Sequence, residues 1–165
     1  MKLIADKLGK NDKNDRLRFV RADGSETQTA MPRQGTLPHD LVHFVVESAL
    51  PLKHGFLGQV ASGSDAGFVM QAVHDHSNPV VETEAIQTEA IVEALQTQLW
   101  AGSFDVDAFT EGARAASSAR GKTALDLSGI DPQAMLYDRA LALLEQWSLV
   151  PHHQSMELSF VAGKA

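Results

Sequence analysis

The sequence predicts one α+β domain, in which several helices pack against a small antiparallel sheet. Two observations indicate the sheet: polar and apolar residues alternate in residues 16–19 and again in residues 156–160, which is the period of a half-buried strand. A third observation indicates the helices, because apolar residues recur at helical spacing between residues 86 and 147. A chain that begins and ends in strands can place both ends in one sheet, with the helices covering one face. We therefore expect residues 1–165 to form a single domain.

The first strands are expected to form a β-hairpin. Asp23 and Gly24 follow the alternating residues, and an Asp-Gly pair favours a tight turn because glycine adopts positive φ without steric cost. Residues 25–31 then supply the return strand. Residues 2–8 are expected to add an edge strand. The hairpin and the C-terminal strand together make up the predicted sheet.

A helix is expected from about residue 38 to residue 50. Pro38 suits its first turn, where a missing N–H costs no hydrogen bond, and Asp40 suits the positive end of the helix dipole. Pro51 cannot continue a helix and ends this one. The four glycines between residues 55 and 67 predict a loop-rich stretch, and residues 73–81 are expected to be a loop as well.

Three further helices are expected in the C-terminal half. The first contains the apolar positions from Ile86 to Leu99, and the alanine-rich residues 105–119 form the second. Asp131 and Pro132 indicate the start of the third, as a capping residue followed by proline in the first turn.

The acidic residues of the first of these helices are expected to face solvent. Glu82, Glu89 and Glu93 share an arc with Gln96, opposite the apolar stripe. Replacing Glu89 and Glu93 by glutamine is therefore expected to change stability by less than about 1 kcal/mol, as at other surface positions.

Composition excludes several kinds of site and partner. The chain has no cysteine, which excludes disulfides, thiolate metal sites and cysteine nucleophiles. The net charge is −7, and although the first 33 residues carry a net charge of +3, the remainder is strongly acidic and disfavours a nucleic-acid partner. No apolar stretch has the length of a membrane span, and residues 1–15 lack the pattern of a signal peptide. We expect a cytoplasmic protein with no membrane partner.

One face of the first helix carries the residues with the most specific chemistry. At roughly 100° per residue, His43 lies about 40° from His39, and Glu47 lies about 80° from it. Asp40 falls within the same narrow arc, whereas nearly all other residues of this helix are apolar. Such a helix is expected to be buried over most of its surface, so its polar stripe either faces solvent or lines an internal polar site.

Two histidines at positions i and i+4 can bind one metal ion, as in the zinc-peptidase motif His-Glu-x-x-His. We predict a divalent metal, zinc by preference, with His39, His43 and Glu47 as ligands. Asp40 takes the place of the motif's glutamate and is the candidate catalytic residue, as an orienting group or as the base for a metal-bound water in a hydrolase. The third ligand can instead come from another histidine, namely His54, His74, His76, His152 or His153.

Two other interpretations of this face remain open. The polar residues can form a pocket for a small molecule without any metal. They can also be structural, with His39 and Asp40 completing the start of the helix and His43 packed in the core. In the last case the protein is a non-enzymatic interaction protein, and we expect a homodimer. The sequence does not decide whether the protein is an enzyme.

Residues 16–63 resemble a group of uncharacterised bacterial proteins. The resemblance comprises the hairpin around an Asp-Gly turn, the LPHDLVHFVVE segment at residues 37–47, and the Gly-Phe-x-Gly segment at residues 55–58. It implies that these residues belong to one fold unit and that the protein is bacterial. It implies no activity.

A shorter resemblance concerns His39, Asp40 and His43 alone. A zinc-binding family of ubiquinone-biosynthesis proteins also carries His-Asp-x-x-His, with a glutamate some twelve residues further along. Gly55 occupies that position here. The resemblance therefore implies neither that family's function nor its complete ligand set.

Overall fold

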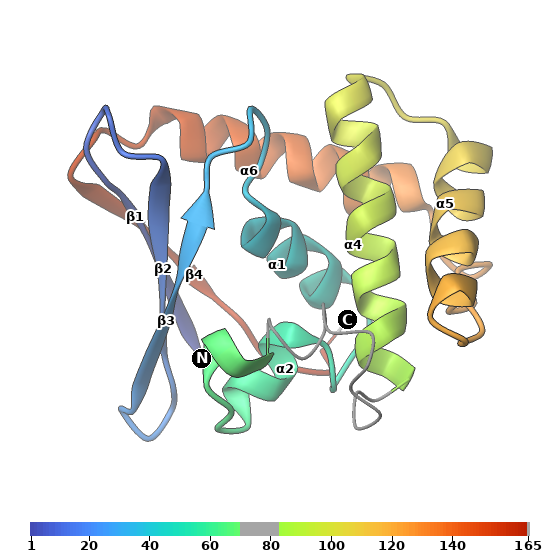
Figure 1. Cartoon of the computed structure of the whole chain (residues 1–165), viewed down its shortest axis with the longest axis horizontal. Helices are drawn as coiled ribbons and strands as arrows, with labels where there is room; N and C mark the ends of the chain where they lie inside the picture. The colour runs from blue at the N-terminus through green and yellow to red at the C-terminus, as the bar shows by residue number, and fades with distance from the viewer. Residues whose placement is uncertain (70–82, 165) are drawn as a thin grey trace.

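The computed structural model describes residues 1–69 and 83–164 and confirms the α+β fold class. One four-stranded antiparallel sheet has the order β3-β2-β1-β4, and the helices lie on one side of it (Figure 1). The strands are β1 (Lys2–Lys7), β2 (Asn14–Val20), β3 (Glu26–Pro32) and β4 (Gln154–Ser159). The helices are α1 (His39–Ala49), α2 (Phe56–Ala61), α4 (Thr83–Ala101), α5 (Val106–Ala119), the π-helical turn η1 (Gln133–Tyr137) and α6 (Asp138–Leu149).

Strand β1 is central in the sheet, so the expectation that residues 2–8 form an edge strand is wrong. Leu3 pairs with Phe19 of β2 on one side and with Leu158 of β4 on the other. The N-terminal amine of Met1 also donates a hydrogen bond to the carbonyl of Phe160 at 2.8 Å. Both ends of the chain therefore lie in the sheet, as the alternation at each end predicts.

The two faces of the sheet have opposite chemistry. Leu3, Leu17 and Phe19 point into the core and are fully buried. On the other face, the Asp6 carboxylate accepts hydrogen bonds from Arg18 Nε at 2.7 Å and from other side chains around it. Hydrogen bonding to the Arg18 guanidinium outweighs partial burial and lowers the pKa of Asp6. The outer face thus carries an ionised cluster, and the hydrophobic core that the described residues form lies on the helical side.

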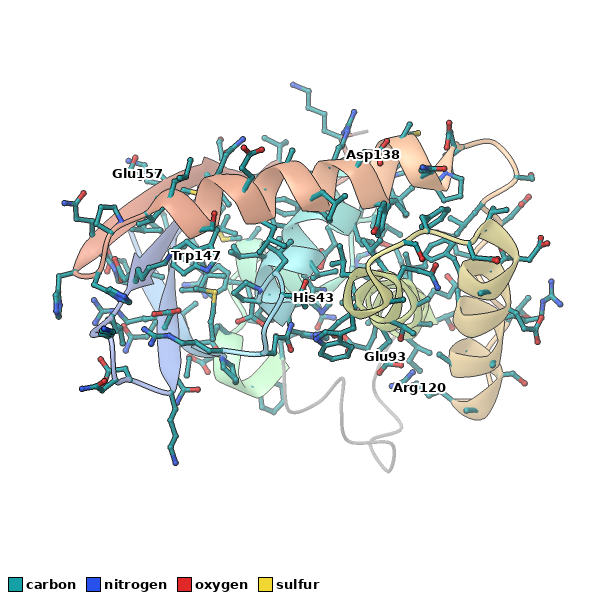
Figure 2. All side chains as sticks on the ribbon, turned by 90° about the horizontal axis from the view of Figure 1, so that it is seen from above. His43, Glu93, Arg120, Asp138, Trp147 and Glu157 are labelled. Atoms are coloured by element: carbon teal, nitrogen blue, oxygen red, sulfur yellow. The ribbon has the colours of Figure 1, made fainter. Side chains whose placement is uncertain are left out.

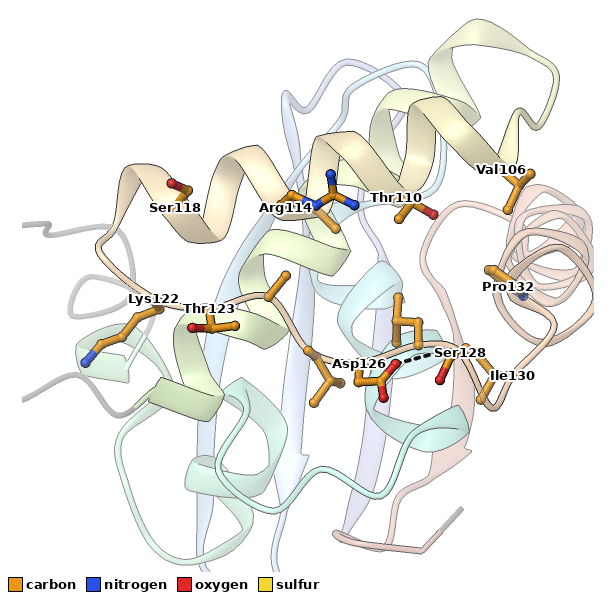
Figure 3. Close-up of a pocket in the computed structure, with 14 residues that line it drawn as sticks. Val106, Thr110, Arg114, Ser118, Lys122, Thr123, Asp126, Ser128, Ile130 and Pro132 are labelled. Carbon is orange, nitrogen blue, oxygen red and sulfur yellow. Dashed lines mark hydrogen bonds between the residues drawn. The ribbon is translucent and has the colours of Figure 1, made fainter.

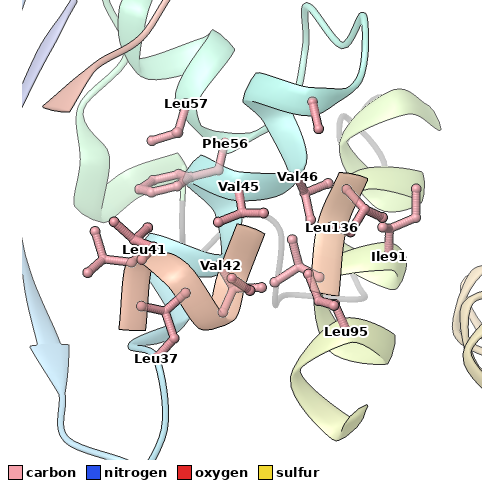
Figure 4. Packing of buried hydrophobic residues seen from close by; sticks show 14 of the residues in the cluster. Leu37, Leu41, Val42, Val45, Val46, Phe56, Leu57, Ile91, Leu95 and Leu136 are labelled. Carbon is pink, nitrogen blue, oxygen red and sulfur yellow. The ribbon is translucent and has the colours of Figure 1, made fainter. Parts of the chain in front are cut away.

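Helix α1 lies between the sheet and α4, at the centre of the molecule (Figure 1). Its apolar side chains belong to one buried cluster with residues of the sheet and of α4, and Figure 4 shows Val42, Val46, Leu136 and Leu95 of α4 in that cluster. Eight of its eleven residues are buried, including Asp40, His43 and Glu47. The polar stripe of α1 is therefore internal, which is one of the two alternatives that the sequence leaves open.

Helix α4 is enclosed on two sides, because α1 packs against one side and α5 against another (Figure 1). The expectation that Glu89 faces solvent is wrong, since its side chain is 0 % exposed. Glu93 is partly exposed and pairs with Arg120 at 2.5 Å (Figure 2). Glu82 lies outside the described residues. A helical wheel assumes one solvent face, and here a neighbouring helix covers that face around Glu89.

A short helix, α2, replaces part of the loop expected between residues 55 and 67. It packs closely on the segment that joins it to α1, because a Cβ at Gly58 would lie 2.1 Å from the backbone oxygen of Lys53. The loop expected at residues 73–81 lies outside the described residues. The capping prediction at Asp131 is confirmed, since its carboxylate accepts a hydrogen bond from the Ala134 N–H at 3.1 Å.

Candidate metal centre

His39 and His43 lie side by side on α1, as their spacing predicts. Their ring centroids are 5.0 Å apart, and the planes of the rings are inclined by 72°. His43 is only 1 % exposed and lies in the interior between the sheet and α4 (Figure 2). His39, one turn nearer the start of the helix, is partly exposed. The pair therefore reaches from the core toward the surface.

Glu89 of α4 faces both imidazole rings with one carboxylate. Its Oε2 lies 2.9 Å from His43 Nε2, and its Oε1 lies 3.2 Å from His39 Nε2. The candidate ligand atoms of His39, His43 and Glu89 all lie within 4.8 Å of one another. Two nitrogen donors from one helix and one carboxylate from another thus converge in a buried position.

Glu47 lies on the opposite side of His43 from Glu89. Its Oε1 accepts a hydrogen bond from His43 Nδ1 at 3.0 Å. Its two oxygens also accept hydrogen bonds from the backbone N–H groups of Leu57 and Gly58, each at 3.1 Å. The sequence predicts Glu47 as the third metal ligand, but the structure places Glu89 beside the Nε2 atoms and Glu47 behind His43.

Asp40 is buried near this cluster, with 4 % of its surface exposed. Its Oδ2 has no hydrogen-bond partner among the described residues. Burial raises the pKa of Asp40 to about 6, although the nearby His43 and His39 oppose this rise. A carboxyl group with a pKa near neutrality can exchange a proton at physiological pH.

Gln96, two turns beyond Glu89 on α4, completes the surroundings of His39. Its Oε1 lies 3.0 Å from His39 Nδ1, and the glutamine is itself buried. Helix α4 therefore supplies both a carboxylate facing His39 Nε2 and an amide oxygen facing His39 Nδ1. Sequence reasoning places Glu89 and Gln96 in solvent, yet their shared arc is a polar stripe complementary to the stripe on α1.

In the absence of a metal ion, the same geometry forms a buried ion network. Burial lowers the pKa of His43, but the charges of Glu89 and Glu47 outweigh it and raise the pKa to about 10. Burial raises the pKa of Glu89, but the facing His43 and His39 outweigh it and hold that pKa well below its usual value. The site therefore holds an imidazolium between two carboxylates.

The other predicted histidine ligands do not join this cluster in the described part of the chain. His152 Nδ1 donates a hydrogen bond to the backbone oxygen of Leu8 at 2.8 Å, and His152 is exposed on the surface. His54 and His153 are exposed as well. His74 and His76 lie outside the described residues.

A separate groove of about 750 Å³ lies between α5 and residues 122–132 (Figure 3). Apolar residues such as Val106, Ile130 and Pro132 line one end of the groove. Asp126 lies along it and accepts a hydrogen bond from the N–H of Ser128 at 2.9 Å. The described residues that line this groove include no histidine, so its chemistry differs from that of the cluster on α1 and α4.

Comparisons with protein-family models, with curated proteins and with solved structures gave no match. The resemblance of residues 16–63 to uncharacterised bacterial proteins stays a prediction. Among the described helices, none combines the length and the apolar character needed to cross a membrane.

Proposed function

We propose that this protein binds one divalent transition metal ion, zinc by preference, through His39 Nε2, His43 Nε2 and the carboxylate of Glu89. The supporting observation is that two imidazole nitrogens of α1 face the same buried carboxylate at 2.9 and 3.2 Å. Zinc binds histidine and carboxylate ligands at about 2.0–2.2 Å, so its tetrahedral ligands lie about 3.4 Å apart. Small movements of side chains are enough to close the three ligands around an ion.

The balance of buried charge also supports a cation at this position. Asp40, Glu47 and Glu89 bring three carboxyl groups into one buried region, whereas two imidazoles oppose them. Burying a charge without a partner costs much free energy. A divalent ion compensates the carboxylates while both imidazoles stay neutral, which is the form that binds metal.

Three protein ligands leave one coordination position for water or substrate, as in catalytic zinc sites. A metal-dependent hydrolase acting on a small molecule is therefore the activity we propose for this centre. The metal would lower the pKa of a bound water, and Asp40 would take the proton. Glu47 is less suited to this role because its oxygens already accept hydrogen bonds from His43 and from two backbone N–H groups.

The proposal is tested by thermal unfolding and titration calorimetry of untagged, metal-stripped protein. Zinc binds only the folded state, so the melting temperature should rise with added zinc. His43→Ala should abolish this rise, whereas the surface variant His152→Ala should keep it. Absence of binding heat for zinc, manganese and nickel below millimolar concentration would reject a metal centre. The cluster would then be a buried ion network, and the alternative proposal is a non-enzymatic interaction protein that acts as a homodimer.

A further inference from the structure

We infer that Glu47 is the positioning residue of this metal centre and that Gly55 provides the space it needs, so that the start of α2 controls the affinity for metal. This inference rests on the proposed metal-binding function. It assigns to Glu47 a role different from that of a ligand. It also gives the segment that joins α1 to α2 a part in binding, although that segment supplies no ligand.

The hydrogen bonds of Glu47 fix both its own position and the orientation of His43. The Glu47 side chain is 0 % exposed and accepts from His43 Nδ1 at 3.0 Å and from the N–H groups of Leu57 and Gly58 at 3.1 Å. A neutral imidazole that donates from Nδ1 has its lone pair on Nε2. This is the nitrogen that faces Glu89 at 2.9 Å. A carboxylate behind a ligand histidine in this way sets its tautomer and raises its basicity.

The backbone conformation at Gly55 does not require glycine, but the space beside it has no room for a side chain. Its φ of −68° and ψ of −178° are ordinary extended values that other residues adopt. A Cβ at this position would lie 2.5 Å from the carboxyl carbon and 2.5 Å from Oε2 of Glu47. Both atoms belong to a carboxylate that accepts three hydrogen bonds, so any displacement of it would lengthen or break at least one of them. Close approach of Gly55 therefore keeps Glu47 against His43.

The two histidines differ in what orients them. His39 Nδ1 faces Gln96 on α4, the helix that also supplies Glu89. His43 Nδ1 faces Glu47, which is tied to the backbone of α2. A disturbance of α2 should therefore act on His43 and leave His39 in place. Binding free energies are reciprocal, so metal binding should in turn stabilise the hydrogen bonds of α2 to Glu47.

The first test is a zinc titration against a competing chelator. We expect Gly55→Ala to bind zinc about 10–100-fold more weakly than the unchanged protein, the usual effect of losing a carboxylate that hydrogen-bonds to a metal-ligating histidine. Gly129→Ala is the control, because a Cβ there meets no atom within 4 Å. In a Glu47→Ala background the added Cβ has no carboxylate to strike, so Gly55→Ala should cause no further loss. Equal affinity of Gly55→Ala and the unchanged protein, or losses that simply add in the double variant, would overturn the inference.

The second test needs no variant and does not depend on the folding of one. Amide hydrogen exchange of Leu57 and Gly58 should slow when zinc is added to the unchanged protein. The reference is the amide of Lys122, which donates a hydrogen bond of 3.0 Å to the backbone oxygen of Ser117. Neither residue belongs to the histidine cluster. Unchanged exchange at Leu57 and Gly58 in zinc-loaded protein would overturn the inference and leave the metal centre standing. Failure of the unchanged protein to bind zinc at all would instead reject the proposed function.

Discussion

Replacing Glu89 by glutamine tests the residue on which the proposed ligand set depends most. Glutamine keeps the shape of the side chain but removes the negative charge that faces His39 and His43 at 3.2 and 2.9 Å. Because Glu89 is fully buried, its side chain has no exposed surface through which bulk solvent could compensate the lost interaction. We expect the metal-free variant to lose about 1–3 kcal/mol of stability, the cost of an impaired buried hydrogen-bonding group. A helical wheel alone predicts less than about 1 kcal/mol for a surface glutamate.

The effect on the zinc-bound protein is larger and more specific. At a free zinc concentration of 100 Kd, binding stabilises the folded state by about 2.7 kcal/mol. For a chain of 165 residues, each kcal/mol raises the melting temperature by about 2–4 °C, so the expected rise is about 5–10 °C. Glu89→Gln removes the only carboxylate of the proposed ligand set and should abolish this rise.

Differential scanning calorimetry with and without zinc measures both effects. Glu93→Gln is the matched control, because Glu93 lies one turn further along α4 and pairs with Arg120 away from the histidines. Its zinc-induced rise should equal that of the unchanged protein. A full zinc-induced rise in Glu89→Gln would refute the assignment of Glu89 as a ligand.

Three further predictions concern pH and topology. The pKa of His43 is raised to about 10, so in the proposed centre zinc would have to displace its proton. Zinc affinity should then increase about tenfold per pH unit between pH 7 and 9, and a flat calorimetric profile would contradict this. Burial raises the pKa of Asp15, but hydrogen bonding to Arg33 outweighs burial and lowers the pKa. The ionised carboxylate of Asp15 therefore stabilises the folded state fully above about pH 4, and this contribution is lost as pH falls further. The free energy of unfolding of Asp15→Asn, measured with urea, should therefore vary less between pH 2 and 4 than that of the unchanged protein. Deleting residues 155–165 removes most of β4 and the buried Phe160, so cooperative melting at the original temperature would contradict the topology.

The fold class follows from local patterns, because strand alternation and helix periodicity are properties of neighbouring residues. The strands of the hairpin, the helix that begins at His39 and the strand near the C-terminus lie close to where those patterns predict them. The central position of β1 does not follow from such patterns, since Leu3 pairs with Leu158, which lies far away along the chain. Only the tertiary structure shows which strands become neighbours.

In the candidate site, too, local spacing predicts some residues, whereas tertiary packing alone places the others. His39 and His43 are adjacent because an i and i+4 spacing on one helix fixes their proximity. Glu89 belongs to another helix, and its contact with these histidines depends on how α1 and α4 pack. The sequence of α4 nonetheless indicates this contact, since Glu89 and Gln96 form a polar stripe that matches the polar stripe on α1. A helical wheel places that stripe in solvent because it represents a helix with one covered face, whereas α4 is covered by both α1 and α5.

A crystal structure of the untagged protein grown with zinc, with anomalous diffraction at the zinc edge, would locate the bound ion and its ligands. We predict one strong anomalous peak at about 2.0–2.2 Å from His39 Nε2, His43 Nε2 and a carboxylate oxygen of Glu89. Glu47 should still face His43 Nδ1 in that structure. A peak at the surface histidines alone, with His39 and His43 still hydrogen-bonded to Glu89, would contradict it.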